Sequence, residues 1–170
     1  MKRIVIIGAG ISGLFIANLF KKNSNYQVTI YEKNNLINLD NGYGIQLSVN
    51  SIKFLNEIGF EKLKNDKKFT PEKINFYSNK NSDKICELDI SDFNSENCKY
   101  TTLKRSALIN FLKKDLEDLI KTDHNISKID HEAKKIKLSF ENSETKECDY
   151  LIVSDGVFSK SKSLISNNKT

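Results

Sequence analysis

The pattern of apolar and polar positions at the start of the chain predicts a strand, a helix and a second strand. Residues 2–7 (KRIVII) form a short, β-branched run of the kind that parallel sheets bury on both faces. In residues 11–22 the apolar side chains recur at helical spacing, and residues 26–31 (YQVTIY) alternate as a strand does. The three elements together have the length of one βαβ unit, which is about 30 residues.

The rest of the chain predicts a mixture of helices and mainly antiparallel strands. Residues 33–45 are expected to be a loop, followed by a helix that Ser48 caps and Gly59 closes. A second, strongly amphipathic helix is expected over residues 105–120, and the polar tail 157–170 offers no further core element. Further strands are expected at 74–77, 84–90, 101–103, 125–130, 134–140 and 150–153, with polar turns at 79–83 and 141–146.

Composition indicates a soluble globular protein. Of the 170 residues, 38% are hydrophobic and 29% are charged, and no apolar window is long enough for a transmembrane helix. Glycines interrupt the first apolar run, so we expect no export signal. Cys86, Cys98 and Cys148 are odd in number and far apart, which predicts reduced thiols in a cytoplasmic protein rather than a disulfide framework.

The net charge of +5 arises almost entirely from lysines interspersed with acidic residues, since Arg3 and Arg105 are the only arginines. This pattern argues against a nucleic-acid partner, although it allows a mild attraction to anionic cofactors or membrane headgroups that no motif specifies. His124 and His131 lack further ligands at metal-binding spacing. We therefore expect them to be solvated surface residues, and we expect no metal site.

The candidate chemistry begins with Gly8-Ala9-Gly10-Ile11-Ser12-Gly13, a G-x-G-x-x-G sequence between the first strand and the first helix. Gly8 allows a sharp turn, Gly10 has no Cβ and lets a pyrophosphate approach the backbone, and Gly13 lets the helix pack closely on the strand. Phosphates would then lie at the helix N-terminus, near the free N–H groups of Ile11 and Ser12.

An acidic residue stands where such a site would need it. Glu32 ends the second strand, 19 residues after Gly13, and a carboxylate there can accept hydrogen bonds from both ribose hydroxyls of an adenosine. Its negative charge disfavours a 2′-phosphate, so NADP is not the expected ligand of this loop. A glycine-rich turn without a ligand, beside a surface Glu32, is the alternative.

From Ile4 to Lys33, the chain resembles the FAD-dependent aromatic hydroxylases, or group A flavin monooxygenases. This family includes para-hydroxybenzoate, salicylate and ubiquinone-biosynthesis hydroxylases. Three further stretches are similar to the family, and the order of all four is more specific than the first alone. These stretches are 42–47 (GYGIQL) with Asn50, Leu55 and Gly59; 102–105 (TLKR) with Leu108 and Leu112; and 149–156 (DYLIVSDG) with Ser159.

The resemblance implies roles for residues outside the glycine loop. Lys33 would join Glu32 in binding FAD, Arg105 would lie near the FAD pyrophosphate, and Asp155 with Gly156 would lie near the phosphates and the passing NAD(P)H. Arg105 is otherwise an ordinary first-turn charge of an amphipathic helix, and Asp155-Gly156 is otherwise a plain turn.

The chain departs from the family pattern at two positions. Ser154 stands where the family has alanine, which is a small change. Lys162 stands where the family has arginine, and lysine loses the two-pronged guanidinium, which puts the NAD(P)H role of this segment in question.

The resemblance implies an α/β fold: a Rossmann-like FAD-binding βαβ domain, of the glutathione-reductase type, with an inserted and mostly antiparallel β segment of a substrate domain. We expect residues 1–70 to form the Rossmann-type part, 71–100 the inserted segment, and 101–170 the return to the FAD-binding domain. The family's third fingerprint, a Gly-Asp pair that grips the ribityl chain, would lie beyond Thr170. We therefore expect either the N-terminal part of a longer enzyme or a truncated gene product.

Two classes of function follow. In the first, the chain is part of a monooxygenase whose FAD, reduced by NAD(P)H, uses O₂ to hydroxylate an aromatic or quinone-like substrate. No catalytic acid or base can be named, and we expect no substantial turnover by these 170 residues alone. In the second, the chain is a non-catalytic module that binds the ADP half of a dinucleotide. Another FAD oxidoreductase, such as a prenyl reductase, is the alternative within the first class.

Overall fold

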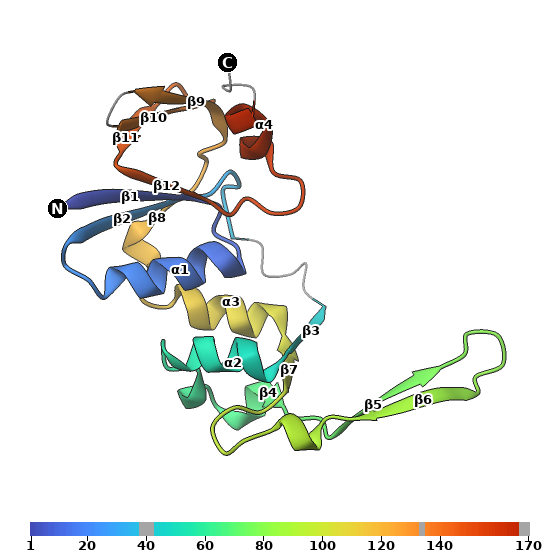
Figure 1. Cartoon of the computed structure of the whole chain (residues 1–170). Helices are drawn as coiled ribbons and strands as arrows, with labels where there is room; N and C mark the ends of the chain where they lie inside the picture. Colours follow the sequence, from blue (N-terminus) through green and yellow to red (C-terminus); the bar gives the residue numbers. More distant parts are fainter. Residues whose placement is uncertain (38–42, 133–134, 167–170) are drawn as a thin grey trace. The chain divides into compact units, whose positions relative to one another are not determined.

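The computed structural model describes residues 1–37, 43–132 and 135–166, and the chain folds as two units (Figure 1). Unit 1 comprises Met1–Leu39 and Leu112–Thr170, and unit 2 comprises Asp40–Phe111. The unit boundaries place the predicted inserted strands inside unit 2.

Unit 1 is built on a four-stranded parallel sheet in the order β12-β1-β2-β8. A three-stranded antiparallel sheet in the order β11-β10-β9 accompanies it. The elements of this unit are β1 (Lys2–Ile7), α1 (Ile11–Lys21), β2 (Tyr26–Tyr31), η4 (Glu117–Leu119), β8 (Ile120–Lys121), β9 (Ile126–Glu132), β10 (Lys135–Phe140), β11 (Thr145–Cys148), β12 (Tyr150–Val153) and α4 (Lys160–Ser166).

Both faces of the parallel sheet in unit 1 are covered, which explains why β1 is a continuous apolar run. Alternate residues of β1 point to opposite faces. Val5 and Ile7 join a buried cluster with side chains of the antiparallel sheet, including Leu138 and Phe140. The helix α1 lies along the other face of the sheet (Figure 1). Unit 1 therefore has three layers, in the order α1, parallel sheet, antiparallel sheet. The strand β1 lies in the middle layer, and its carboxyl end leads into the turn before α1.

Unit 2 contains a small antiparallel sheet in the order β3-β7-β4 and a separate hairpin, β5-β6. Its core includes Ile52, Phe60 and Leu108, each at most 3% exposed. Its elements are β3 (Gly44–Leu47), α2 (Val49–Asn56), η1 (Phe60–Lys62), η2 (Asn65–Lys67), β4 (Lys68–Phe69), β5 (Lys73–Tyr77), β6 (Lys84–Asp89), η3 (Ser91–Phe93), β7 (Thr101–Lys104) and α3 (Arg105–Lys113), whose last two residues belong to unit 1.

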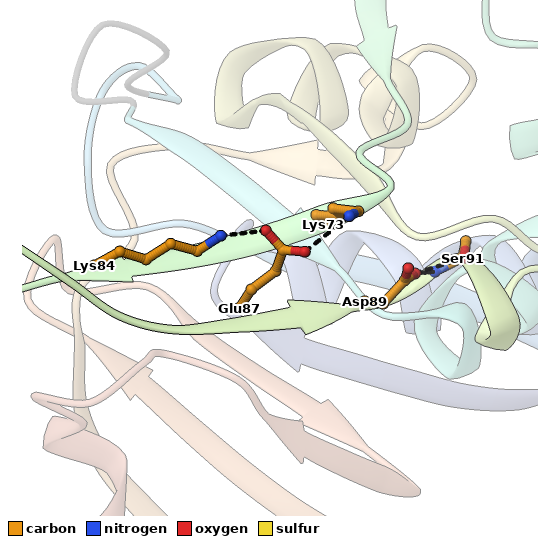
Figure 2. A network of polar contacts seen from close by, with 5 residues as sticks. All are labelled: Lys73, Lys84, Glu87, Asp89 and Ser91. Atoms are coloured by element: carbon orange, nitrogen blue, oxygen red, sulfur yellow. Dashed lines mark hydrogen bonds and ion pairs between the residues drawn. The ribbon is translucent and has the colours of Figure 1, made fainter.

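The β5-β6 hairpin carries different chemistry on its two faces. On one face, Glu87 accepts hydrogen bonds from both Lys73 and Lys84 (Figure 2), and these bonds hold the pKa of Glu87 below its usual value. On the opposite face, Phe76 and Leu88 are about half exposed. Because the ion pairs lie at the surface, where water screens them, they contribute little to folding.

The predicted fold class is confirmed: a parallel, Rossmann-like sheet stands beside antiparallel sheets. The strands predicted from 26–31 and 150–153 have the expected bounds. The predicted loop at 33–45 was wrong at its end, because Gly44 already begins β3; its residues 38–42 lie outside the described part of the chain. Gly59 has a left-handed φ of 90°, but α2 ends earlier, at Asn56.

The helix predicted over 105–120 was also wrong in length. It ends at Lys113. Asn18 Nδ2 of α1 donates to the Leu112 carbonyl in its last turn at 2.7 Å, and Lys21 Nζ donates to the carbonyl of Asp115, just beyond the helix. The chain can then turn and add Ile120 to the sheet as β8.

The C-terminal tail holds a helix where none was expected. Lys160–Ser166 forms α4, and the Ser159 hydroxyl accepts the Lys162 N–H at 3.1 Å as an N-terminal cap. Leu164 packs against the cluster between the two sheets, and Ser161 is fully buried. The turn predicted at 141–146 was too long, since β11 begins at Thr145.

Candidate functional site

The turn from β1 into α1 is closed by a glycine that no other residue could replace without strain. Gly8 has a φ of +101°, and its N–H donates to the Tyr31 carbonyl at 2.8 Å. A Cβ on Gly8 would lie 2.5 Å from the carbonyl oxygen of Ser154. The carboxyl ends of β1 and β12 therefore meet directly at this turn.

Gly13 brings the helix onto the same point. A Cβ at Gly13 would lie 2.0 Å from the Gly8 carbonyl oxygen and 2.7 Å from the Ser154 hydroxyl. The first turn of α1 thus rests on the backbone of the glycine loop, with no room for a side chain.

Gly10 differs from the other two glycines because its missing Cβ faces open space. Among the residues that the structure describes, no heavy atom lies within 4 Å of the position that the Cβ would take. Gly10 is the N-cap of α1; in the described part of the chain no side-chain cap hydrogen bond is formed, and the first turn of the helix holds no acidic residue. The N–H groups of Ile11 and Ser12 therefore stand at a positive helix end with room in front of them, which suits an anion such as a phosphate.

Glu32 lies beside this loop and is held in a fixed orientation. Its Oε2 accepts the Ala9 N–H at 2.9 Å, and its Oε1 accepts the backbone and side-chain N–H groups of Asn34 at 3.1 and 2.7 Å. The carboxylate is partly buried rather than a free surface charge. A carboxylate can accept about four hydrogen bonds, so with three accepted the group, at Oε2, retains capacity for one hydroxyl of a sugar.

Asp155 and Gly156 follow β12 on the same edge of the parallel sheet. Asp155 Oδ2 accepts the Ser161 N–H at 3.1 Å. Burial raises the pKa of Asp155, but hydrogen bonds from Ser159 and Ser161 outweigh it and hold the pKa below its ordinary value of 3.8. Gly156 has a φ of +87°, so the turn after Asp155 depends on glycine. In the described residues Asp155 supports α4, and its predicted contact with phosphates or NAD(P)H stays a prediction.

The other predicted residues are less closely tied to the loop. Lys33 is exposed directly after Glu32. Arg105 belongs to unit 2, where it begins α3 and its N–H donates to the Tyr43 carbonyl at 3.2 Å. Within unit 1, the structure brings together the glycine loop, Glu32 and Asp155; the roles assigned to Lys33 and Arg105 stay predictions. Gly42, part of the second similar stretch, lies outside the described residues.

The sequence reasoning treated Ser154 as a small departure, yet its side chain supports the loop. Ser154 Oγ lies 2.9 Å from the Ile7 carbonyl and 3.2 Å from the Gly8 carbonyl, so its hydroxyl donates at the end of β1. Nothing in the local sequence signals this contact, because it spans 146 residues.

His124 was expected on the surface, but its side chain is only 12% exposed. Its ring packs 4.8 Å from Tyr31 and 5.1 Å from Phe140, measured between ring centroids. The expectation was wrong because the histidine completes an aromatic cluster behind β2. Among the residues that the structure describes, no group of three or more His, Cys, Asp or Glu side chains could hold a metal ion.

Comparisons with known proteins agree with this geometry. Residues 6–38 match the model of the NAD(P)-binding Rossmann-like domain family. No curated protein matches the sequence.

Solved structures give much longer matches. The chain superposes on 2,6-dihydroxypyridine-3-hydroxylase from Arthrobacter nicotinovorans with a TM-score of 0.79 and 16% identity, covering 98% of this chain and 40% of that one. A Photorhabdus luminescens protein described as an FAD-containing monooxygenase superposes with a TM-score of 0.75 and 23% identity, covering 99% of this chain and 43% of that one. A variant of HpxO from Klebsiella pneumoniae, solved with FAD, superposes with a TM-score of 0.78 and 17% identity, covering 92% of this chain and 40% of that one.

Over nearly its whole length, the chain has the fold of a part of these structures. It spans about two-fifths of the length of these structures. The match takes in both units of this chain, since 98% of its length is covered. Within the described ranges, no helix of this fold is long and apolar enough to cross a bilayer.

Proposed function

We propose that the chain is the FAD-binding portion of a flavin-dependent monooxygenase that uses NAD(P)H and O₂ to hydroxylate an aromatic or quinone-like substrate. The observation that carries this proposal is the open space at Gly10, in front of an uncapped helix and beside an oriented Glu32. This combination suits the ADP half of a dinucleotide, in which two phosphates and a ribose lie next to one another.

The residues of the chain would bind and orient the cofactor. The N–H groups at the start of α1 would donate to the pyrophosphate, and Glu32 would accept a hydrogen bond from a ribose hydroxyl. Arg105 would add a cation for the pyrophosphate, and Asp155 would lie near the phosphates and the reductant. When bound, FAD supplies the redox chemistry and the reaction with O₂.

The neighbours with the same fold support this assignment. One is named as a hydroxylase of a dihydroxypyridine, one is described as FAD-containing, and one was solved with FAD. The substrate of this chain would accordingly be a small ring compound. Three unpaired cysteines also support a reducing, cytoplasmic location.

Ligand titrations of the purified chain test the cofactor. We expect FAD to bind with quenching of its fluorescence and ADP to compete, whereas FMN, which lacks the AMP moiety and has only one phosphate, should bind far more weakly than FAD. ADP-ribose should bind more tightly than 2′-phospho-ADP-ribose, because Glu32 repels the extra phosphate. If FMN binds as well as FAD, or if ADP fails to compete, the proposed site is wrong.

The same titration distinguishes the two possible functions of the chain. A flavoprotein should bind FAD more tightly than ADP, because the riboflavin half adds contacts. Equal affinities for FAD and ADP would instead indicate a module that holds only the ADP half.

A further inference from the structure

The β5-β6 hairpin of unit 2 has two outer edges that can accept a further strand. In the described part of the chain, β5 and β6 pair with each other and with no other strand. Figure 1 shows the hairpin running out from the other elements of unit 2, so both edges are accessible. An isolated two-stranded hairpin is marginally stable, and an unpaired edge is a template for another strand.

Backbone groups of β5 point alternately towards β6 and out of the sheet. The Ile90 N–H donates to the Glu72 carbonyl at 2.9 Å, and this pair continues the register of the hairpin. Because hydrogen-bonded pairs alternate along an antiparallel ladder, every second residue counted from Glu72 bonds to β6. The N–H and C=O groups of Lys73, Asn75 and Tyr77 therefore point out of the edge of β5.

The sequence of β5 is complementary to itself in one antiparallel register. When Asn75 lies opposite Asn75 of a second copy, Lys73 lies opposite Tyr77, and every outward-facing residue meets another. The same register sets Ile74 opposite Phe76 on the apolar face, which is a favourable pair of a β-branched and an aromatic side chain. The two lysines lie at opposite ends of the paired strands, so no like charges oppose each other.

The edge of β6 is protected against such pairing. Its Ile85 has no partner on β5 and forms a bulge, where the register of the hairpin shifts. Beyond the bulge, the outward-facing residues are Glu87 and Asp89, which lie opposite the outward-facing Asn75 and Lys73. Pairing these residues with their own copies would set carboxylates opposite one another. The strand β5 has neither a bulge nor an acidic residue.

We propose that a second copy of this chain pairs with the edge of β5 and forms a closed dimer, with a continuous sheet in the order β6-β5-β5-β6. The same strand is used on both copies, so the contact satisfies itself and assembly stops at the dimer. One short strand from each copy takes part, so the association is transient and increases with protein concentration. The protected β6 edges lie at the outside of the sheet, which opposes further addition.

Sedimentation velocity of the whole chain in reducing buffer tests the dimer. We expect a reversible monomer–dimer equilibrium between about 10 μM and about 1 mM. Asn75→Lys would set two ammonium groups opposite each other in the dimer, whereas within one chain the new lysine lies opposite Glu87, so the hairpin is retained. Asn79→Lys makes the same change in the turn of the hairpin. The first substitution should weaken dimerisation at least about fivefold and the second less than about twofold.

Three results of this experiment would overturn the proposal. They are a parent chain that stays monomeric at about 1 mM, equal effects of the two substitutions, and continuous growth beyond the dimer. Circular dichroism verifies that both variants are folded. Both should also bind ADP as the parent chain does, because the proposed FAD site does not use the hairpin, so a failure of the dimer is distinguishable from a failure of that site.

Disulfide trapping tests the register itself. In the proposed dimer, the Cα atoms of the two copies of Asn75 lie about 5.5 Å apart, which suits a disulfide bond. The background variant Cys86→Ser removes the exposed native thiol. In it, Asn75→Cys should cross-link in a glutathione buffer at least about fivefold faster than Asn79→Cys, since the two copies of residue 79 lie at opposite ends of the paired strands. Equal rates of cross-linking would contradict the proposed register.

Discussion

Replacing Gly10 by valine tests whether the glycine loop binds a nucleotide, because the change should leave the chain folded. The backbone at Gly10, with φ −79° and ψ −176°, can be adopted by any residue, and a Cβ there meets no atom of the described residues within 4 Å. The cost to stability is then that of a poor N-cap residue, about 1 kcal/mol. The added methyl groups would occupy the space that we assign to the pyrophosphate.

The expected loss of affinity follows from the hydrogen bonds that valine would prevent. A hydrogen bond to a charged group contributes about 1.5–3 kcal/mol. Losing one such bond between the loop N–H groups and a phosphate would weaken ADP binding by roughly 10- to 150-fold. Isothermal titration with ADP measures this loss, and a thermal melt followed by circular dichroism verifies that the variant is folded.

Substitutions at two further glycines serve as controls for the Gly10→Val variant. Gly44→Ala places a Cβ in ordinary contact, 3.9 Å from the Leu103 carbonyl, and should change neither stability nor ADP affinity. Gly13→Ala forces a Cβ to within 2.0 Å of the Gly8 carbonyl and should destabilise the fold by about 1–3 kcal/mol or more. A folded Gly10→Val chain that binds ADP within twofold of the parent would refute the pyrophosphate assignment.

Three more outcomes follow from the described contacts. Glu32→Gln keeps an acceptor for the Ala9 N–H but loses the charge. ADP should then bind about tenfold more weakly, while the affinity for 2′-phospho-ADP-ribose should change little. Equal losses of affinity for the two ligands in competition titrations would argue against the ribose role. Because the pKa of Asp155 is lowered by folding, its contribution to stability is complete above pH 3.8 and is lost as the pH falls below that value, so urea midpoints should fall more steeply there for the parent than for Asp155→Asn. Burial raises the pKa of Cys148 to about 11, so N-ethylmaleimide at pH 8 should modify the exposed Cys86 first and Cys148 only after denaturation, as mass spectrometry of peptides would show.

The first βαβ unit could be predicted from sequence because local signals carry it. The apolar run of β1, the three glycines and the alternation of β2 each act over a few residues, and the structure places the elements within one residue of the expected bounds. Glu32 could be found in the same way, since it directly follows β2.

The elements that were predicted wrongly depend on contacts between residues that are distant in the sequence. Leu116 continues the apolar spacing of α3, so the local sequence favours a longer helix. In the fold, Asn18 of α1 binds the Leu112 carbonyl in the last turn, and Lys21 binds the Asp115 carbonyl just beyond it. The helix α4 has a polar sequence and depends on the caps from Asp155 and Ser159.

The pairing of β1 with β12 makes the glycine loop dependent on the far end of the chain. β1 is a central strand, and Ser154, just beyond β12, both packs against Gly8 and Gly13 and donates to the end of β1 across 146 residues. During synthesis, at roughly 5–20 residues per second, the loop would therefore wait many seconds for its support after its own residues had left the ribosome. A nascent chain that ends before β12 should display the full glycine sequence and still fail to bind nucleotide. Nucleotide capture would thus report that translation has passed residue 154.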